Sequence, residues 1–246
     1  MFDEDFRERF LATIEDPFKN GVHILFNEWW KFAPADVREA YDKVVTDNPD
    51  FEDFASGALY SEPLDLGELA TLPDGSLGKT YHDWIIKNNL TASIALNYKA
   101  LHDQHEATGG LDGMSPLMKA AVLRAYQTHD FQHVVTGYDD SSRGEIALQA
   151  FCLAQHQYPY FGMWIAVTTS RMTLVNPKMI VPMMDAITDG WQLGRATPNM
   201  QCIRWEELLD RPLEEVRSLV GLEMSSLALG FQEKRRLREV ASSAHA

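Results

Sequence analysis

The sequence predicts an all-α fold, arranged as a single-domain multi-helix bundle. Apolar residues recur with the helical period along most of the chain, and alternating runs bounded by Asn-Gly or Asp-Gly turns are nearly absent. No repeat, low-complexity stretch or Gly-, Ser- or Pro-rich linker divides the 246 residues. We therefore expect residues 1–246 to form one helical domain.

Helix boundaries follow from caps, prolines and glycines. The best-defined helix begins after Ser115, which can cap it, has Pro116 at its first position and ends before Gly137. The expected helices, in chain order, cover residues 6–14, 35–46, 66–72, 76–87, 90–102, 115–135, 142–156, 159–171, 177–193, 205–220 and 224–240.

Charge and composition limit the classes of function. The formal net charge of −14 argues against nucleic-acid binding and disfavours simple electrostatic attachment to an anionic membrane. The two cysteines, Cys152 and Cys202, are far apart, as expected in a reducing cytoplasm. The acidic N-terminus predicts no signal or transit peptide, and the most apolar window, residues 158–167, is too short to cross a bilayer.

Four polar residues are candidate metal ligands. His129 and His133 continue the helical stripe of Met118, Val122 and Ala125, so we expect both histidines to face the interior. They lie one turn and about 40° apart, and Asp130 is about 60° from His133. After eleven intervening residues, Glu145 begins the next helix and can pack back onto this one. Two imidazoles and carboxylates are ligands that a divalent cation takes in proteins.

A structural role is also open to each of these residues. A buried histidine can be held by a backbone carbonyl, and Ser142 to Glu145 reads as a capping box with Glu145 at the third helical position. Their conjunction on an otherwise apolar face favours a shared ligand, because unpaired polar groups there are costly.

The pattern His-Asp-x-x-His, followed by Glu145, resembles the metal-binding signature of the coenzyme Q biosynthesis protein 4 family. Flanking residues are similar too, at 136–138, 144–147 and 72–81, where Ser76 replaces the usual Thr, and at 191–195 and 204–219. The resemblance covers approximately residues 66–222. Residues 1–65 carry none, and 223–246 form a helical tail with a basic cluster of Lys234, Arg235, Arg236 and Arg238, expected to be a solvated helix end.

The resemblance implies an all-helical protein with an internal apolar cavity for an isoprenoid tail. It implies a divalent metal, zinc first and iron or magnesium as alternatives, held by His129, Asp130, His133 and Glu145. The implied activity is metal-dependent removal of the C1 carboxyl from a polyprenylated hydroxybenzoate ring, coupled to hydroxylation, in ubiquinone biosynthesis. The alternative is a lipid-binding scaffold that organises the other ubiquinone-biosynthesis enzymes.

The resemblance also carries expectations about location. Family members are peripheral to the inner membrane, and the lack of a mitochondrial leader predicts a bacterial member in the cytoplasm or on that membrane. The sequence leaves open whether the chain forms a homodimer.

An aromatic segment after the second motif helix has two interpretations. Tyr158, Tyr160, Phe161 and Trp164, with nearby methionines, are either ordinary core or the wall of the lipid pocket, where adaptable methionines suit a flexible chain. A further alternative for the whole chain is a His-Asp metal phosphohydrolase, raised by the pairs His82-Asp83 and His102-Asp103 with His105 nearby. We expect His82 and Asp83 to lie on a solvated helix face instead.

Overall fold

The computed structural model describes residues 4–47, 51, 63–92 and 98–243. Every regular element in these ranges is a helix, and one isolated β-bridge joins Ser76 to Pro212. The elements are α1 (Glu4–Glu15), α2 (Pro17–Asn20), α3 (Val22–Phe32), α4 (Ala35–Thr46), α6 (Leu66–Ala70), α7 (Leu77–Lys87), α8 (Tyr98–Ala107), α9 (Pro116–Thr136), α10 (Ser142–His156), α11 (Pro159–Leu174), the 3-10 helix η2 (Pro177–Met179), α12 (Ile180–Ala196), the 3-10 helix η3 (Trp205–Glu207), α13 (Leu213–Leu219) and α14 (Ser226–Ser243).

The ends of α9 are those that the sequence predicts. The Ser115 hydroxyl accepts a hydrogen bond from the Met118 backbone N–H at 3.1 Å, and Pro116 occupies the first helical position. Gly137 ends the helix in the left-handed conformation, with φ of 80°. The cap and the glycine therefore define where the candidate ligand helix starts and stops.

Three parts of the helix prediction are wrong. Helices α2 and α3 were not expected, although the spacing of Val22, Leu25 and Phe26 is helical. The helix expected over 205–220 is interrupted before α13, because Pro212 has no N–H to donate and restricts the residue before it. The helix expected over 90–102 is described only from Tyr98, since Leu90 is not helical, Thr91 and Ala92 form a turn, and 93–97 lie outside the described ranges.

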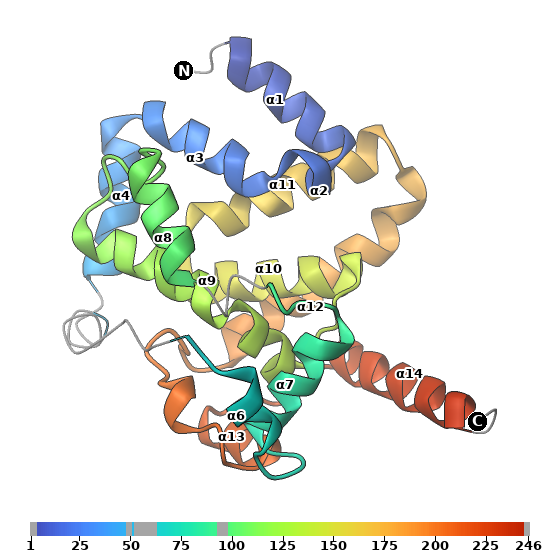
Figure 1. Cartoon of the computed structure of the whole chain (residues 1–246). Coiled ribbons are helices and arrows are strands. Elements are labelled where there is room, and N and C mark those ends of the chain that lie inside the picture. The colour runs from blue at the N-terminus through green and yellow to red at the C-terminus, as the bar shows by residue number, and fades with distance from the viewer. Residues whose placement is uncertain (1–3, 48–50, 52–62, 93–97, 244–246) are drawn as a thin grey trace.

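The helices form layers (Figure 1). Helices α1, α3 and α11 contact one another on one side of the bundle, and α6, α7 and α13 lie on the opposite side. Helices α9, α10 and α12 run between these groups, and α14 projects from the body toward the C-terminus. The candidate ligands on α9 and α10 therefore lie in the middle layer. Within the described ranges, none of the helices has the length and apolarity needed to cross a bilayer.

Helices α10 and α12 make the closest helix pair. A Cβ atom built on Gly190 would lie 1.9 Å from the Ala147 carbonyl oxygen, and one built on Gly194 would lie 2.6 Å from that of Phe151. These glycines let the two backbones touch, which sets the position of α10 and of Glu145 near its start.

Helix α9 is capped from a distant part of the chain. The buried Arg217 side chain, on α13, donates from Nε to the Val135 carbonyl at 2.8 Å and from Nη2 to the Val134 carbonyl at 3.0 Å. These carbonyls belong to the last turn, where the helix itself offers no partner. Arg217 thus stabilises the end of α9 directly after His133.

Candidate metal centre

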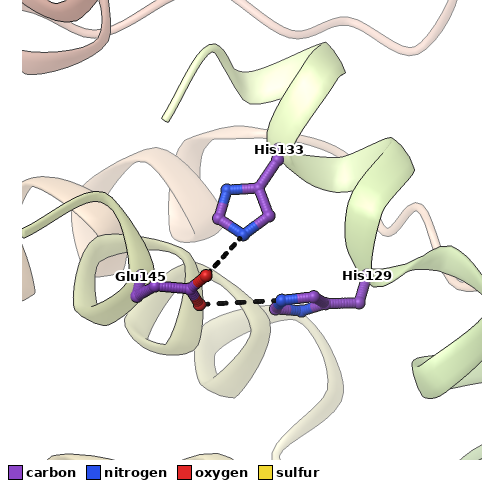
Figure 2. Close-up of side chains that lie close together, drawn as sticks. All are labelled: His129, His133 and Glu145. Carbon is purple, nitrogen blue, oxygen red and sulfur yellow. Dashed lines mark ion pairs between the residues drawn. The ribbon is translucent and has the colours of Figure 1, made fainter. Parts of the chain in front are cut away.

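Three of the expected ligands converge between α9 and α10 (Figure 2). The ring nitrogens of His129 and His133 and a carboxylate oxygen of Glu145 all lie within 4.8 Å of one another. The Nε2 atom of His133 is 3.3 Å from Glu145 Oε1, and the Nε2 atom of His129 is 3.6 Å from Oε2. Among the described residues, these three form the one such group of histidine, cysteine or acidic side chains.

The ring of His133 is held with one nitrogen directed at this group. Its Nδ1 atom lies 3.0 Å from the Tyr138 carbonyl oxygen, so Nδ1 carries the hydrogen and donates it. Nε2 then presents its lone pair, and this buried atom has no hydrogen-bond partner. Trp84 on α7 stacks against the ring, with centroids 5.1 Å apart. A histidine bonded through one nitrogen to a carbonyl, with the other nitrogen left open, is the usual arrangement of a metal ligand.

The separations of Glu145 from the two histidines suit a shared cation, and the ligand atoms of the two histidines lie within 4.8 Å of one another. Two ligands that are each about 2.1 Å from a tetrahedral cation lie roughly 3.4 Å from one another. The Glu145 oxygens are 3.3 Å and 3.6 Å from the two histidine nitrogens, which is close to that value. The residues present therefore fit a divalent ion with two imidazoles and one carboxylate.

The capping-box interpretation of Glu145 is wrong. The N-cap of α10 is Ser141, whose hydroxyl accepts a hydrogen bond from the Gly144 N–H at 3.3 Å, so Glu145 is the fourth helical residue rather than the third. Its backbone N–H donates to the Ser141 carbonyl at 2.8 Å. The adjacent serines allow either start, and the observed one directs the Glu145 carboxylate to the histidines.

Asp130 lies outside the group of three. It is buried, lines the cavity described below, and its charge adds to burial in raising the pKa of Tyr81 on α7. The helical rotation of about 100° between His129 and Asp130 accounts for this divergence. Asp130 therefore contributes negative charge beside the centre, whereas direct ligation by its carboxylate remains a prediction.

The Glu145 carboxylate and His129 shift one another's pKa. Burial would raise the pKa of Glu145, yet the two imidazoles, in their protonated forms, hold it well below its usual range. Burial would lower the pKa of His129, but the Glu145 carboxylate and Asp130 raise it above 6.5 overall. In the metal-free protein the His129 imidazole therefore takes up a proton more readily than a free one, and a cation would compete with that proton.

We expect Glu145→Gln to lower the pKa of His129 below 6.5 in the metal-free protein. Burial lowers this pKa, and the variant lacks the Glu145 carboxylate that raises it. A raised histidine pKa stabilises the fold below about pH 6.5 and this contribution is lost as pH rises through the raised value. The metal-free variant should therefore gain relatively less stability on acidification from neutral pH. An NMR titration of the His129 ring protons, assigned with His129→Gln, measures the shift. An unchanged pKa would contradict the His129–Glu145 pair.

A cavity of about 360 Å³ opens beside the centre. His129 and Glu145 are on its wall, which accounts for the 30% exposure of each side chain, whereas His133 is 1% exposed behind them. The expectation that both histidines are interior is thus met fully only by His133. The rest of the wall is largely apolar and aromatic, formed by Leu90, Ala92, Val122, Ala125, Tyr126, Asp130, Gln149, Tyr158, Tyr160, Phe161 and Trp164.

All four residues expected in a lipid pocket line this cavity. Tyr158, Tyr160, Phe161 and Trp164 belong to its wall, at the start of α11 and just before it. Tyr158 and Phe161 also pack into the main hydrophobic core. The segment therefore belongs both to the core and to the cavity wall, whereas lipid binding by the cavity stays a prediction.

Several site residues were missed from the sequence. Gln149 is one helical turn after Glu145 and faces the same cavity, so its spacing could have identified it. Trp84 and the Tyr138 carbonyl contact His133 from outside its own helix, and no local pattern predicts such contacts.

Neither of the two further His-Asp pairs, His82-Asp83 and His102-Asp103, belongs to a metal-type group among the described residues. Asp83 is exposed on α7 and accepts hydrogen bonds from Lys79 Nζ at 2.8 Å and His82 Nδ1 at 2.8 Å. The side chain of His105 lies outside the described residues. This arrangement gives no support to the phosphohydrolase alternative.

Comparison with known proteins decides the family. Residues 57–226 match the family described as "Coenzyme Q (ubiquinone) biosynthesis protein Coq4". The chain belongs to the Coq4 family. It is 28% identical over 167 residues to "Ubiquinone biosynthesis protein COQ4, mitochondrial" of Yarrowia lipolytica, covering 67% of this chain and 58% of that protein. It is 27% identical over 181 residues to the Sclerotinia sclerotiorum protein of the same description, covering 72% and 57%.

The matched part of the Coq4-family chain therefore spans less than two thirds of these relatives. A crystal structure from Nostoc punctiforme, described as that of a "Putative ubiquinone biosynthesis protein", superposes with a TM-score of 0.66 at 22% identity. It covers 90% of this chain and 99% of that one, so the two share the fold.

Proposed function

We propose that this Coq4-family protein is a metal-dependent enzyme of ubiquinone biosynthesis that acts on the ring of a polyprenylated hydroxybenzoate. In this reaction the C1 carboxyl leaves as carbon dioxide and a hydroxyl takes its place. The ring carbon loses two electrons, so the reaction needs an oxidant such as dioxygen. The family membership supports the pathway, and the site geometry supports the ring chemistry.

The observation that carries the proposal is His133 Nε2. This buried nitrogen has no hydrogen-bond partner, its tautomer is set by the Tyr138 carbonyl, and it meets His129 and Glu145 at the wall of a cavity large enough for an aromatic ring. An orphaned lone pair in such a place is costly unless a ligand takes it. A cation bound there would supply Lewis acidity to an adjacent oxygen.

The donor set indicates which metal is bound. Two imidazoles and a carboxylate suit zinc or non-haem iron, whereas magnesium prefers oxygen ligands and keeps several waters. We propose zinc as the first candidate and iron as the second. Asp130 balances the cation's charge from the cavity wall.

The chain's own residues bind and orient the substrate. The aromatic wall excludes water and holds the ring and the first isoprene units, because apolar contacts there remove both from solvent. Two polar atoms in this wall, Tyr158 Oη and Gln149 Oε1, are buried without hydrogen-bond partners. We propose that the Tyr158 hydroxyl donates a hydrogen bond to a phenolic or carboxyl oxygen of the substrate, and that Gln149 Oε1 accepts one from the ring hydroxyl. These contacts would direct the carboxyl toward His129 and Glu145.

Turnover by the purified, metal-loaded protein tests the proposal. A polyprenylated hydroxybenzoate labelled at its carboxyl carbon should release labelled carbon dioxide and yield a ring hydroxylated at that position. The protein in which Glu145 is glutamine should do neither. Tight binding of the substrate with no turnover under any metal or oxidant would instead support the scaffold role, in which the protein presents lipid to partner enzymes.

We expect Trp164→Ala to weaken binding of a prenylated ring about ten-fold or more while leaving metal affinity near that of the parent. Trp164 lines the cavity but is not in the ligand group, and a buried aromatic contact contributes on the order of 2 kcal/mol. Isothermal titration with a short-chain prenylated hydroxybenzoate and, separately, with zinc measures both. Trp191→Ala, at an exposed tryptophan on α12, is the control. Equal lipid affinity in the Trp164 and Trp191 variants would show that the lipid binds elsewhere.

A further inference from the structure

A second and much smaller cavity adjoins the cavity beside the metal centre. Its volume is about 20 Å³, and its wall includes Arg124 on α9 and His156 at the end of α10. Ala125, Tyr158 and Phe161 line both cavities, so these three side chains form a shared wall between them. A buried water needs roughly 10–15 Å³ of cavity. The small cavity therefore has room for one water.

Two side chains that line the small cavity each carry a buried polar atom without a hydrogen-bond partner. These atoms are Nδ1 of His156 and the hydroxyl oxygen of Tyr158, a residue that is only 7% exposed. Gln157, between them, has a φ of 51°, in the left-handed region that residues other than glycine rarely adopt. This turn brings the side chains before and after it to the same cavity. Because buried polar atoms are costly without partners, a cavity of this size beside two of them suits one ordered water.

Burial fixes the protonation states of both groups. It lowers the pKa of His156 to about 4, so the imidazole is neutral near pH 7 and can accept one hydrogen bond. Burial also raises the pKa of Tyr158 well above its usual value, and Tyr126 and Tyr160 add to this effect. The Tyr158 hydroxyl therefore keeps its hydrogen, and it can donate one hydrogen bond while its oxygen accepts another.

Arg124 determines how a water in the small cavity would be oriented. Its side chain lines the cavity and pairs with Glu206, with Nη1 and Oε1 2.7 Å apart. A guanidinium can only donate hydrogen bonds, so the oxygen of a nearby water faces it and the two hydrogens point away. One of these hydrogens can then be donated to Nδ1 of His156 and the other to the oxygen of Tyr158.

We propose that His156 is a positioning residue for the substrate, acting on Tyr158 through one ordered water in the small cavity. The water makes the Tyr158 oxygen an acceptor on that side, so the hydroxyl hydrogen is directed into the larger cavity. There it is donated to an oxygen of the substrate ring. Without His156, the water loses one acceptor and the hydroxyl hydrogen can turn away from the substrate. The inference rests on the proposed function for the ring oxygen, but not for the water.

Titration calorimetry of the full-length, metal-loaded protein with two matched ligands tests this role. One ligand is a short-chain prenylated hydroxybenzoate, and the other is the corresponding prenylated benzene, which lacks the hydroxyl and the carboxyl. His156→Leu should lower the affinity for the hydroxybenzoate about five-fold, the effect of one hydrogen bond, and leave the affinity for the benzene unchanged. A residue that only supports the fold would affect both ligands alike. His156→Asn should restore most of the affinity, because its amide oxygen can accept the hydrogen bond from the water.

Tyr158→Phe completes a double-mutant cycle. It should cost about as much as His156→Leu, and the double variant should bind the hydroxybenzoate no more weakly than Tyr158→Phe alone, because both changes remove the same contact. Additive losses, equal losses for the two ligands, or parent-like binding of the hydroxybenzoate by His156→Leu would each overturn the positioning role.

A crystal structure of the parent separates this inference from the proposed function. The small cavity should hold one water within hydrogen-bond distance of His156 Nδ1 and Tyr158 Oη, whether or not a substrate is bound. A parent that binds neither ligand but holds this water would show that the proposed substrate is wrong while the water site is correct. A parent without the water overturns the inference and leaves the metal and turnover tests unchanged.

Discussion

Replacing Glu145 with glutamine is expected to lower the affinity for zinc at least about 100-fold while the metal-free fold stays intact. Loss of a group that only supports a metal ligand costs 10- to 100-fold, roughly, so loss of the carboxylate ligand itself should cost no less. Glu145 is not a cap, and the Ser141 cap of α10 remains in the variant. The metal-free variant should therefore still fold, with a lower free energy of unfolding near neutral pH because the pairing of the carboxylate with His129 is lost.

Metal titration calorimetry with elemental analysis measures the affinity, and urea unfolding measures the stability. His129→Ala is the positive control, since it removes a ligand whose side chain is 30% exposed and so leaves the core undisturbed. Glu207→Gln makes the same substitution at a side chain that is 71% exposed, and it should bind metal as the parent does. Parent-like affinity in Glu145→Gln, with loss in His129→Ala, would leave the histidines without Glu145 as a ligand.

Gly190→Ala is expected to destabilise the metal-free protein by about 3 kcal/mol. The added Cβ would lie 1.9 Å from the Ala147 carbonyl oxygen, which is backbone and cannot rotate away, so α10 and α12 must separate. Because Ala147 is two residues after Glu145, the same movement displaces the carboxylate from the histidines. We therefore expect weaker metal binding as well.

Gly230→Ala is the matched control for this prediction. A Cβ built on Gly230, in α14, meets no atom within 4 Å, so the same change causes no clash there. Its main effect is to reduce the conformational entropy of the unfolded chain. It should stabilise the protein by roughly 0.5–1 kcal/mol. Urea unfolding of both variants checks the pair. Equal stability of Gly190→Ala and the parent would mean that the helices cross less closely than described.

The parts of the site that depend on local spacing were predictable. One helical turn separates His129 from His133, and the left-handed Gly137 reverses the chain so that Glu145 returns to them. The cap of α10 was misplaced by one residue, because Ser141 and Ser142 are both good caps and only packing chooses between them. Pro212 is a local signal for the break before α13. The helical period of the neighbouring residues nevertheless led to the prediction of one continuous helix.

The parts that depend on tertiary contacts were not predictable from one sequence. Trp84 approaches His133 from α7, and Gly190 approaches Ala147 from α12, and neither pair has a fixed spacing in the chain. For Asp130, the sequence pattern predicts a contact that the structure does not show. Its place in the motif predicts a ligand, whereas its rotation about α9 carries it beside the group rather than into it.

The cap that Arg217 places on α9 has a consequence for the order of events during synthesis. His129, His133 and Glu145 leave the ribosome close together, but the guanidinium that closes the last turn of their helix is 82 residues behind Val135. A nascent chain that already carries all three ligands therefore lacks the group that completes their support. Tight metal binding is accordingly expected only once Arg217 has emerged and docked on the last turn of α9, well after the three ligands themselves.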